Sequence, residues 1–272
     1  MRALSLPGCA CRGAFQFAAL ARLAARGERF DVVAGASSGS ISAATTVAGL
    51  SAEGPDFVRS LMATPIFSRR WLRSERSPFG MGAIVREVLA RCVPEERLQG
   101  TEAELLVATT HAGRYARGLL ARRTPEWERE GLVVHSNRER KNMHEIIVAS
   151  CFIPLLYAGL VRIDGEVHVD GGAADNTLIS VLVDRGATDI TVVTPYPEGA
   201  VSRTVFSPEV PPTAPPHVRL RLVYPKRRLR LGRFDFDPTA IEEALAMEHE
   251  ERVIEPTAEA PVDGRVGAQK SA

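Results

Sequence analysis

Short apolar runs on either side of one amphipathic segment make up the first part of the chain. Arg2–Leu6 and Phe30–Ala34 have the length and composition of strands. Between them, apolar residues recur at the i, i+3, i+4, i+7 spacing of one helix face, and Gly27 ends this segment. The residues of that face are Phe17, Leu20, Ala21 and Ala24. A strand, a helix and a second strand in so short a segment predict parallel strands joined by a right-handed crossover.

The same alternation continues to about residue 194. Strands are expected over Leu105–Thr109, Val133–Val134 and Asp189–Thr194, and helices after Ser37, over Asn142–Ser150 and over Thr177–Arg185. Asp164-Gly165 separates two apolar runs, Val161–Ile163 and Val167–Val169, which is typical of a hairpin. Alternating strands and helices predict an α/β layered core.

The composition changes after Pro195. Val210–Pro216 is Pro-rich and is expected to be an extended connector. Arg219–Val223 alternates basic and apolar residues, as a half-exposed strand does. Asp237 and Pro238 have the residue types of an N-cap and a first helical position, and we expect that helix to run through Arg252.

These patterns predict one domain over residues 1–254. Its core covers residues 2–194, and residues 195–254 form a C-terminal extension. Residues 255–272 are rich in Pro, Gly and polar residues, which favours a disordered tail.

Composition argues against several classes of protein and indicates where in the cell this one is located. The chain has 272 residues, of which 45% are hydrophobic and 25% charged, as is ordinary for a globular protein. Its net charge of +1 does not produce the positive electrostatic field that would attract nucleic acid. The four cysteines, Cys9, Cys11, Cys92 and Cys151, are too scattered for a disulfide framework and lack partners for a metal site. The N-terminal apolar run is shorter than a signal-peptide core, and no segment approaches the roughly 18 apolar residues of a membrane span. We therefore expect a cytoplasmic protein whose membrane contact, if it has one, is peripheral.

The segment Val32–Ser40 carries the strongest chemical signal. An apolar strand enters Gly35-Ala36-Ser37-Ser38-Gly39, and small residues suited to a packed helix follow. Gly-x-Ser-x-Gly between a strand and a helix is typical of a nucleophile elbow, which exposes the serine hydroxyl at a helix N-terminus. The alternative is a turn rich in serine and glycine.

Two other segments supply what a serine nucleophile needs, a base and donors for a developing oxyanion. Asp170 ends an apolar strand and enters the turn Gly171-Gly172. The loop Gly8–Gly13 follows the first strand and leads into a helix, so its amides at Cys9, Ala10 and Cys11 are candidate donors.

In this order the three segments resemble the patatin-like phospholipase family. That family has a Gly-Gly-Gly-x-Arg-Gly loop, a Gly-x-Ser-x-Gly elbow and an Asp-Gly-Gly or Asp-Gly-Ala site, here Gly8–Gly13, Gly35–Gly39 and Asp170–Gly172. The stretches Ala149–Pro154 and Asp170–Asn176 are also similar. The resemblance extends over about residues 2–194 and more weakly over Phe234–Pro238.

The resemblance implies a three-layer α/β/α sandwich with a mostly parallel central sheet, and a lipid acyl hydrolase without a cofactor or a metal. Ser37 would be the nucleophile of a Ser–Asp dyad and Asp170 its general base, with an acyl-enzyme intermediate on a lipid or other acyl ester. The oxyanion hole would lie in the loop Gly8, Cys9, Ala10, Cys11, Arg12 and Gly13. Arg12 matches the family's loop arginine, which suggests that it holds the loop or binds lipid phosphate.

Cys9 and Ala10 depart from the family pattern, since both positions are glycine there. If either position has a positive φ, its Cβ costs on the order of 1 kcal/mol or more. A misaligned oxyanion hole lowers the rate of hydrolysis. The alternative function is therefore a weak or inactive patatin-like protein that binds lipid or acts as a scaffold.

Other interpretations remain open at this stage. An α/β-hydrolase triad would need His217 or His249, and neither is well placed in the sequence; His168 shares a strand face with Asp170 and is a candidate partner. The loop Gly8–Gly13 has a phosphate-loop spacing without the Lys-Ser/Thr that such loops require. Arg219–Arg233 is rich in basic residues, either for anionic headgroups or as a solvated surface. The apolar residues Phe152, Ile153, Leu155, Leu156 and Tyr157 are expected to line an acyl pocket in part and the core in part.

Overall fold

Parallel strands form the centre of the sheet in the computed structural model, which describes residues 1–74, 78–121, 126–153, 157 and 159–257. The parallel strands, in spatial order, are β10 (Arg219–Pro225), β7 (Asp189–Val193), β1 (Arg2–Leu6), β2 (Val32–Gly35) and β3 (Glu104–His111). Antiparallel strands flank them: β11 (His249–Ile254), β4 (Leu132–Ser136), β6 (Glu166–Asp170) and β5 (Val161–Ile163). A separate small sheet pairs β8 (Val201–Ser202) with β9 (Glu209–Val210).

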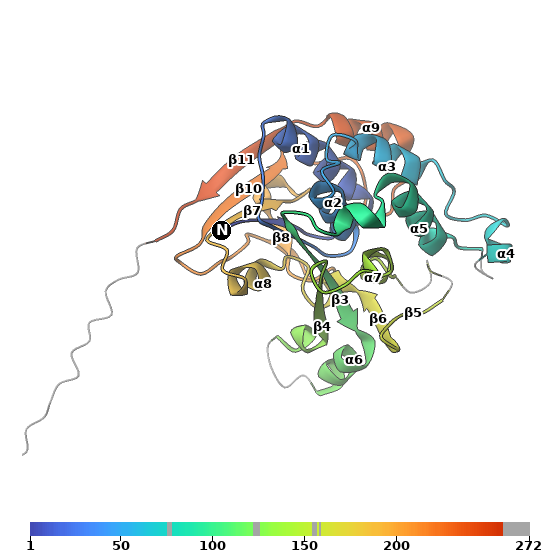
Figure 1. Ribbon diagram of the computed structural model, residues 1–272. Coiled ribbons are helices and arrows are strands. Elements are labelled where there is room, and N and C mark those ends of the chain that lie inside the picture. The colour runs from blue at the N-terminus through green and yellow to red at the C-terminus, as the bar shows by residue number, and fades with distance from the viewer. Residues whose placement is uncertain (75–77, 122–125, 154–156, 158, 258–272) are drawn as a thin grey trace, which may run out of the picture.

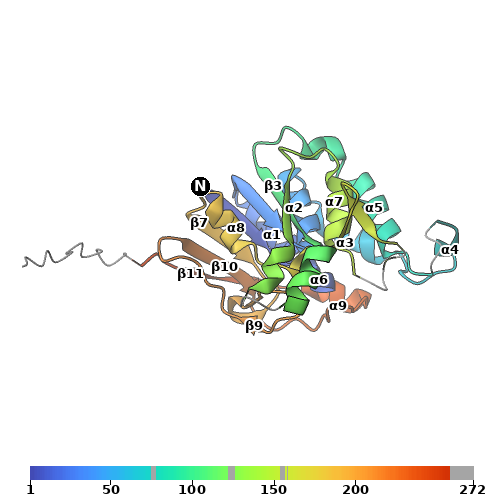
Figure 2. The ribbon, with the colours of Figure 1, turned by 90° about the horizontal axis from the view of Figure 1, so that it is seen from below.

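Helices cover both faces of this sheet (Figures 1 and 2). On one face lie α1 (Gly13–Ala25), α2 (Ser38–Val47), α3 (Gly54–Met62), α5 (Met81–Cys92), α7 (Met143–Ser150) and α9 (Pro238–Ala246), and on the other α8 (Ile179–Asp184). The remaining described helices are α4 (Trp71–Ser74) and α6 (Ala112–Ala121). The three-layer α/β/α fold with a mostly parallel sheet is thereby confirmed.

The central strands are buried on both faces, which explains their continuous apolar sequence. In β1, Leu4 and Leu6 pack with the larger helical layer, and Ala3 packs with the layer of α8. This alternation follows the two-residue period of a strand. On α1, Phe17 and Leu20 are buried as expected, whereas Leu23 is buried in place of Ala24 because the larger side chain faces the core.

Strand β3 brings two distant parts of the sequence together. One edge of β3 pairs with β4 along residues 106–110. On the other edge, residues 106 and 107 pair with β2, and residues 109 and 110 pair with β6. Strands β2 and β6 therefore share one edge of β3, end to end and running toward each other. The residue after β2 and the last residue of β6 meet at this point.

Local signals predicted several of these elements correctly. Asp164 and Gly165 have φ values of 52° and 86° in the hairpin between β5 and β6, which confirms the predicted turn. Asp237 caps α9, since its carboxylate accepts the amide N–H of Thr239 at 3.1 Å.

The predicted helix from Asp237 to Arg252 is wrong beyond Ala246. His249–Ile254 forms β11, antiparallel to β10 at the edge of the sheet. Arg221 of β10 pairs with Glu251 of β11 and with Glu28, so cross-strand ion pairs and backbone pairing outweigh the helical propensity of this charged segment.

The predicted helix over Thr177–Arg185 starts late, at Ile179. The Asp175 carboxylate accepts the amide N–H groups of Thr177 and Leu178, each at 3.0 Å, and Leu178 has a φ of 54°. These bonds hold the preceding residues in a turn.

The C-terminal extension belongs to the same body as the core. β10 and β11 continue the central sheet, and α9 packs with α1. This continuity supports our proposal of one domain over residues 1–254. Of the predicted tail 255–272, residues from 258 onward lie outside the described residues. Among the helices that the structure describes, none has the length and apolarity to cross a bilayer.

Candidate active site

Ser37 lies between β2 and α2 in a backbone conformation that non-glycine residues rarely adopt. Its φ is 52° and its ψ −132°, and α2 starts at the next residue. The turn is tight because α2 passes close to β1: a Cβ on Gly39 would overlap the Leu6 carbonyl oxygen, and one on Gly35 would lie 2.5 Å from the Gly39 oxygen. Such strain is held by its surroundings and is typical of functional sites.

The Ser37 hydroxyl donates a hydrogen bond to the carboxylate of Asp170, with 2.6 Å between Oγ and Oδ2. Asp170 is the last residue of β6, so the end-to-end arrangement of β2 and β6 on β3 places the two side chains together. Both residues are buried, Ser37 being 6% and Asp170 7% exposed.

The surroundings of Asp170 set its protonation. Oδ1 accepts the Gly172 amide N–H at 2.8 Å, and the Asp170 carbonyl oxygen accepts the Thr110 hydroxyl at 2.7 Å. Burial raises the pKa of the Asp170 carboxyl to about 7, although the hydrogen bonds from Ser37 and Gly172 lower it. Gly171 packs against the Ala108 carbonyl oxygen, which keeps the turn after Asp170 close to β3. A carboxyl with this pKa accepts and returns a proton near neutral pH.

In the loop Gly8–Gly13, the amides of Gly8, Cys9 and Cys11 donate to groups outside the loop. The Gly8 N–H donates to Asn176 Oδ1 at 2.8 Å, the Cys9 N–H to Ser38 Oγ at 3.0 Å and the Cys11 N–H to the Arg233 carbonyl oxygen at 3.0 Å. Within the described part of the chain, no hydrogen bond is made by the N–H of Ala10 or of Ser38. These two amides, each at the start of a helical turn, are the donors left open beside Ser37.

The two departures from the family loop differ in conformation. Cys9 has a φ of −149°, which any residue adopts without strain, whereas Ala10 has a φ of 53°. The predicted cost of a Cβ therefore falls on Ala10 alone. Gly13 begins α1 in an ordinary helical conformation, with a φ of −56°.

Arg12 lines neither of the cavities that contain Ser37. Its Nε donates to the Leu231 carbonyl oxygen at 3.0 Å, its guanidinium lies 5.4 Å from the ring centre of Tyr196, and Glu209 is 3.9 Å away. These contacts connect the loop to the C-terminal extension. Of the two roles expected for Arg12, they support holding the loop over binding lipid phosphate.

Sequence reasoning missed three residues that position the site. Asn176 bonds both backbone groups of Gly8: its Oδ1 accepts the Gly8 N–H, and its Nδ2 donates to the Gly8 carbonyl oxygen at 3.1 Å. Ser150 accepts the Ser37 N–H at 2.9 Å, and Ser38 accepts the amide of Cys9. Asn176 and Ser150 do lie in the stretches that resemble the family, so that similarity was the available signal.

The buried thiols of the site are protonated at neutral pH. Burial raises the pKa of both Cys9 and Cys11 to about 12. Among the described residues, no hydrogen bond joins His168 to Asp170. The His168 Nδ1 lies 2.8 Å from Thr109 Oγ1, which also contacts His135 Nε2 at 2.9 Å. The described residues contain no group of three or more His, Cys, Asp or Glu side chains arranged to hold a metal.

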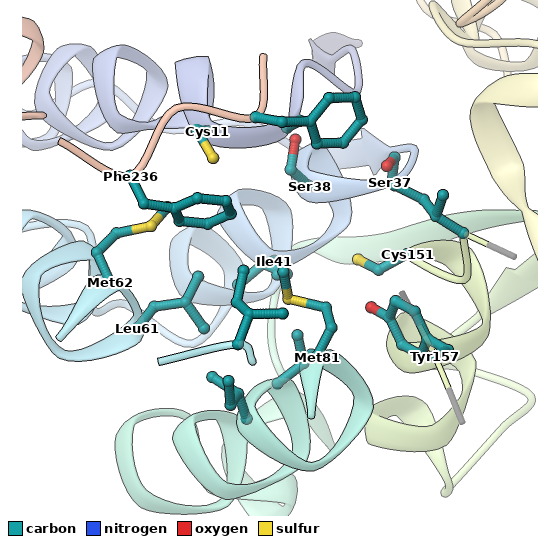
Figure 3. Close-up of a pocket in the computed structure, with 16 residues that line it drawn as sticks. Cys11, Ser37, Ser38, Ile41, Leu61, Met62, Met81, Cys151, Tyr157 and Phe236 are labelled. Atoms are coloured by element: carbon teal, nitrogen blue, oxygen red, sulfur yellow. The ribbon is translucent and has the colours of Figure 1, made fainter. Parts of the chain in front are cut away.

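Ser37 lines two cavities. The narrow one has a volume of about 80 Å³ and is almost wholly apolar; Figure 3 shows Ile41, Met62 and Met81 around it, with Cys151 and Tyr157 on one side. The wider one has a volume of about 450 Å³ and contains Asp170 in its wall.

The segment predicted to line an acyl pocket is divided between these cavities. Ile153 lines both, Tyr157 the narrow one and Phe152 the wider one, and all but Ile153 are buried. Leu155 and Leu156 lie outside the described residues.

Comparison with known proteins agrees with the motifs. Patatin-like phospholipase is the family whose model matches this chain, over residues 4–183. A search of the curated proteins finds no match. Among solved structures, VipD from Legionella pneumophila matches with a TM-score of 0.40 and 14% sequence identity, over 71% of this chain and 49% of that one, so the chain spans about half the length of VipD. The family match covers more than half of the sequence and confirms the resemblance: the chain belongs to the patatin-like phospholipase family.

Proposed function

We propose that this protein cleaves carboxylic esters of lipids, with Ser37 as nucleophile and Asp170 as general base. The observation that carries the proposal is the 2.6 Å hydrogen bond between these buried side chains at the junction of two cavities. Membership of a family of phospholipases supports the lipid substrate. The proposed type of reaction is that of a serine esterase of the phospholipase A kind.

In the first half of the proposed reaction, Ser37 Oγ attacks the ester carbonyl carbon and its proton passes to Asp170 Oδ2. The oxyanion that forms lies near the N-terminus of α2, where the amides of Ala10 and Ser38 are open donors. The ester C–O bond then breaks, and the leaving alcohol takes the proton from Asp170. The acyl group stays on Ser37.

In the second half, water attacks the acyl carbon and gives a proton to Asp170. The bond to Ser37 Oγ breaks, and Ser37 recovers its proton as the fatty acid forms. We assign the acyl chain to the two cavities that Ser37 lines, because the lining of both is mostly apolar. The buried thiols of Cys9 and Cys11 are not competing nucleophiles, since burial raises their pKa values.

A second candidate function is a lipid-binding protein with little or no turnover. The observation in its favour is the positive φ of Ala10, the residue whose amide is an open donor. Against it, the alanine keeps its N–H and is partly exposed at the cavity wall. The loop is therefore strained but retains its donor.

Replacement of either member of the dyad is expected to abolish hydrolysis. Ser37→Ala and Asp170→Asn should each lower kcat/KM for a short soluble acyl ester by about 10³-fold or more, because nucleophile and base act as a unit. His168→Ala is the control and should retain most activity, since its ring bonds Thr109. Circular dichroism verifies folding, and an active, folded Asp170→Asn protein would contradict the dyad.

The activity should depend on the ionised form of Asp170. Because burial raises its pKa to about 7, the ionised fraction increases with pH through that value. We expect kcat/KM to fall about tenfold per pH unit below pH 7 and to level off above it. Steady-state kinetics between pH 5 and 9 test this, and a rate that is constant from pH 5 upward in folded protein would exclude Asp170 as the base.

Ala10→Gly should stabilise the protein by about 1 kcal/mol, since it removes the strain of an alanine held at a positive φ. Urea denaturation measures the change. Cys9→Gly, in the same loop at negative φ, is the matched control and should lower stability because a buried side chain is lost. Hydrolysis that is absent in the wild type and appears in Ala10→Gly would favour the second candidate function over the first.

We also propose that the rim of the cavities contacts a lipid surface. Phe206 and Phe234 line the wider cavity, yet are 77% and 59% exposed. The basic stretch gives weaker support, because Arg221, Lys226 and Arg230 all pair with glutamates. The aromatic rim is thus the better candidate.

Phe206→Ser combined with Phe234→Ser should reduce co-sedimentation with phosphatidylcholine vesicles at least several-fold and leave hydrolysis of the short soluble ester within twofold. Both side chains are exposed, so little folding energy is lost. Ile254→Ser, an exposed apolar position on the edge strand β11, is the control. Unchanged vesicle binding in the double variant would exclude the rim as the contact.

A further inference from the structure

Strand β11 gives the central sheet an open edge. It lies outermost, beyond β10, and within the described part of the chain no other strand pairs with it (Figures 1 and 2). All of its six residues except His249 are exposed. An open edge presents a row of backbone N–H and C=O groups, with which a further strand can pair. The question is then which strand fits this edge.

The pairing with β10 decides which residues of β11 face the open edge. The Lys226 N–H donates to the Glu248 carbonyl oxygen at 3.0 Å, so these two residues form a hydrogen-bonded pair. Hydrogen-bonded and non-hydrogen-bonded pairs alternate along an antiparallel ladder. The even-numbered residues of β11 therefore bond to β10. The backbone groups of His249, Glu251 and Val253 face the open edge.

The other side of β10 agrees with this alternation. Val223, the cross-strand partner of Glu251, accepts the Thr194 N–H with its carbonyl oxygen at 3.0 Å. Arg219 donates its N–H to the Thr188 carbonyl oxygen at 2.9 Å. Thus the odd-numbered residues of β10 bond toward β7, which leaves its even-numbered residues to bond β11.

Two charged side chains of β11 lack a partner. Glu250 and Arg252 are exposed, and within the described residues neither makes a hydrogen bond or an ion pair. They lie on the same face of the sheet, because they are two positions apart in a strand. Glu251 on the other face differs, since Arg221 and Arg26 bind its carboxylate at 2.7 and 2.6 Å. The open edge therefore carries one unpaired anion and one unpaired cation side by side.

A second copy of β11 matches this edge when it runs antiparallel about a two-fold axis at Glu251. The outward backbone groups of Glu251 then bond those of its copy, and His249 bonds the partner's Val253 in the same way. Glu250 lies directly opposite the partner's Arg252, twice per dimer, with Cα atoms roughly 4.5 Å apart. The two Glu251 carboxylates also come close to each other, but arginines already bind each of them.

The other two-fold registers fit less well. An axis at Glu250 or at Arg252 places that residue opposite its own copy, and an axis at His249 places Glu250 opposite the partner's Glu248. An axis at Val253 leaves both unpaired charges without an opposite charge. An axis between two residues would match an outward-facing residue with an inward-facing one. Like charges directly opposite each other are unfavourable, so the register centred on Glu251 is the one that the charges select.

We propose that two copies of this chain associate through β11, in the register centred on Glu251, and form one continuous sheet. Charged side chains on an edge strand normally keep other strands away. Here they attract a second copy, because their order is self-complementary in that register. A single strand pair is a small contact, so the dimer dissociates on dilution. The proposal is independent of the proposed hydrolysis, since no residue of β11 lines either cavity at Ser37.

Sedimentation velocity over a wide range of protein concentration tests the association. Wild-type protein should shift from monomer to dimer as its concentration increases. Glu250→Arg and Arg252→Glu should each raise the dissociation constant about tenfold or more, because two attractive pairs become repulsive. Arg117→Glu makes the same charge change at an exposed arginine of α6, which packs at the other end of the sheet, and should leave the constant unchanged. Wild-type protein that stays monomeric at every concentration would overturn the proposal.

Exchanging the charges tests the register. The double variant Glu250→Arg with Arg252→Glu restores both ion pairs and should dimerise as the wild type does. A mixture of the two single variants should form a heterodimer, since each then supplies the charges that the other lacks. A dimer that neither single variant weakens, or single variants that do not combine in the mixture, would place the contact elsewhere and contradict this register.

The backbone contact has its own test. Val253→Pro removes an N–H that faces the open edge and none that bonds β10, so it should abolish the dimer. Circular dichroism and hydrolysis of a short soluble ester should be unchanged in this variant. Hydrogen exchange of the wild type gives the same information without a substitution. The amides of Glu251 and Val253 should exchange more slowly as concentration increases, whereas that of Arg252 should not change. Exchange at Glu251 and Val253 that does not depend on concentration would exclude the edge as the contact.

Discussion

A carboxyl group buried against a serine hydroxyl is the interaction on which the site depends. Asp170 has no cation beside it in the described structure; what stabilises its ionised form is the hydroxyl of Ser37 and the amide of Gly172. Burial opposes that ionisation, so the carboxyl is balanced near neutral pH. A solvent-exposed aspartate would remain ionised and would be a weak base. Burial of Asp170 in the fold is therefore what would make it an effective base in the proposed reaction.

The sheet provides this burial through one topological feature. Because β2 and β6 share an edge of β3 and run toward each other, Ser37 and Asp170 converge although 133 positions separate them in the sequence. The loop after β1 closes the site from a third direction, and Asn176, shortly after Asp170, clamps it at Gly8. The proposed nucleophile, base and donors thus follow the carboxyl ends of three strands, β2, β6 and β1.

Much of this was predictable from the sequence where the signal is local. The α/β class, the hairpin at Asp164-Gly165 and the cap at Asp237 follow from apolar periodicity and turn chemistry. The edge strand β11 was not predictable, since its charged sequence favours a helix until Arg221 and Glu251 are seen to pair across strands. For the site, the motifs predicted the elbow, the aspartate and the loop together; Ser37 and Asp170 do lie in contact, and their catalytic roles stay a prediction. The open edge of β11 and the order of the charges along it depend on long-range strand pairing that no motif records.

Covalent labelling of the serine tests the central claim most directly. A fluorophosphonate reacts with a serine that a neighbouring base activates, and mass spectrometry identifies the modified residue. We expect modification of wild-type protein at Ser37 alone, and a labelling rate at least about 100-fold lower in a folded Asp170→Asn variant. Wild-type protein that is folded but unlabelled, or an Asp170→Asn variant labelled at the wild-type rate, would contradict an aspartate-activated serine.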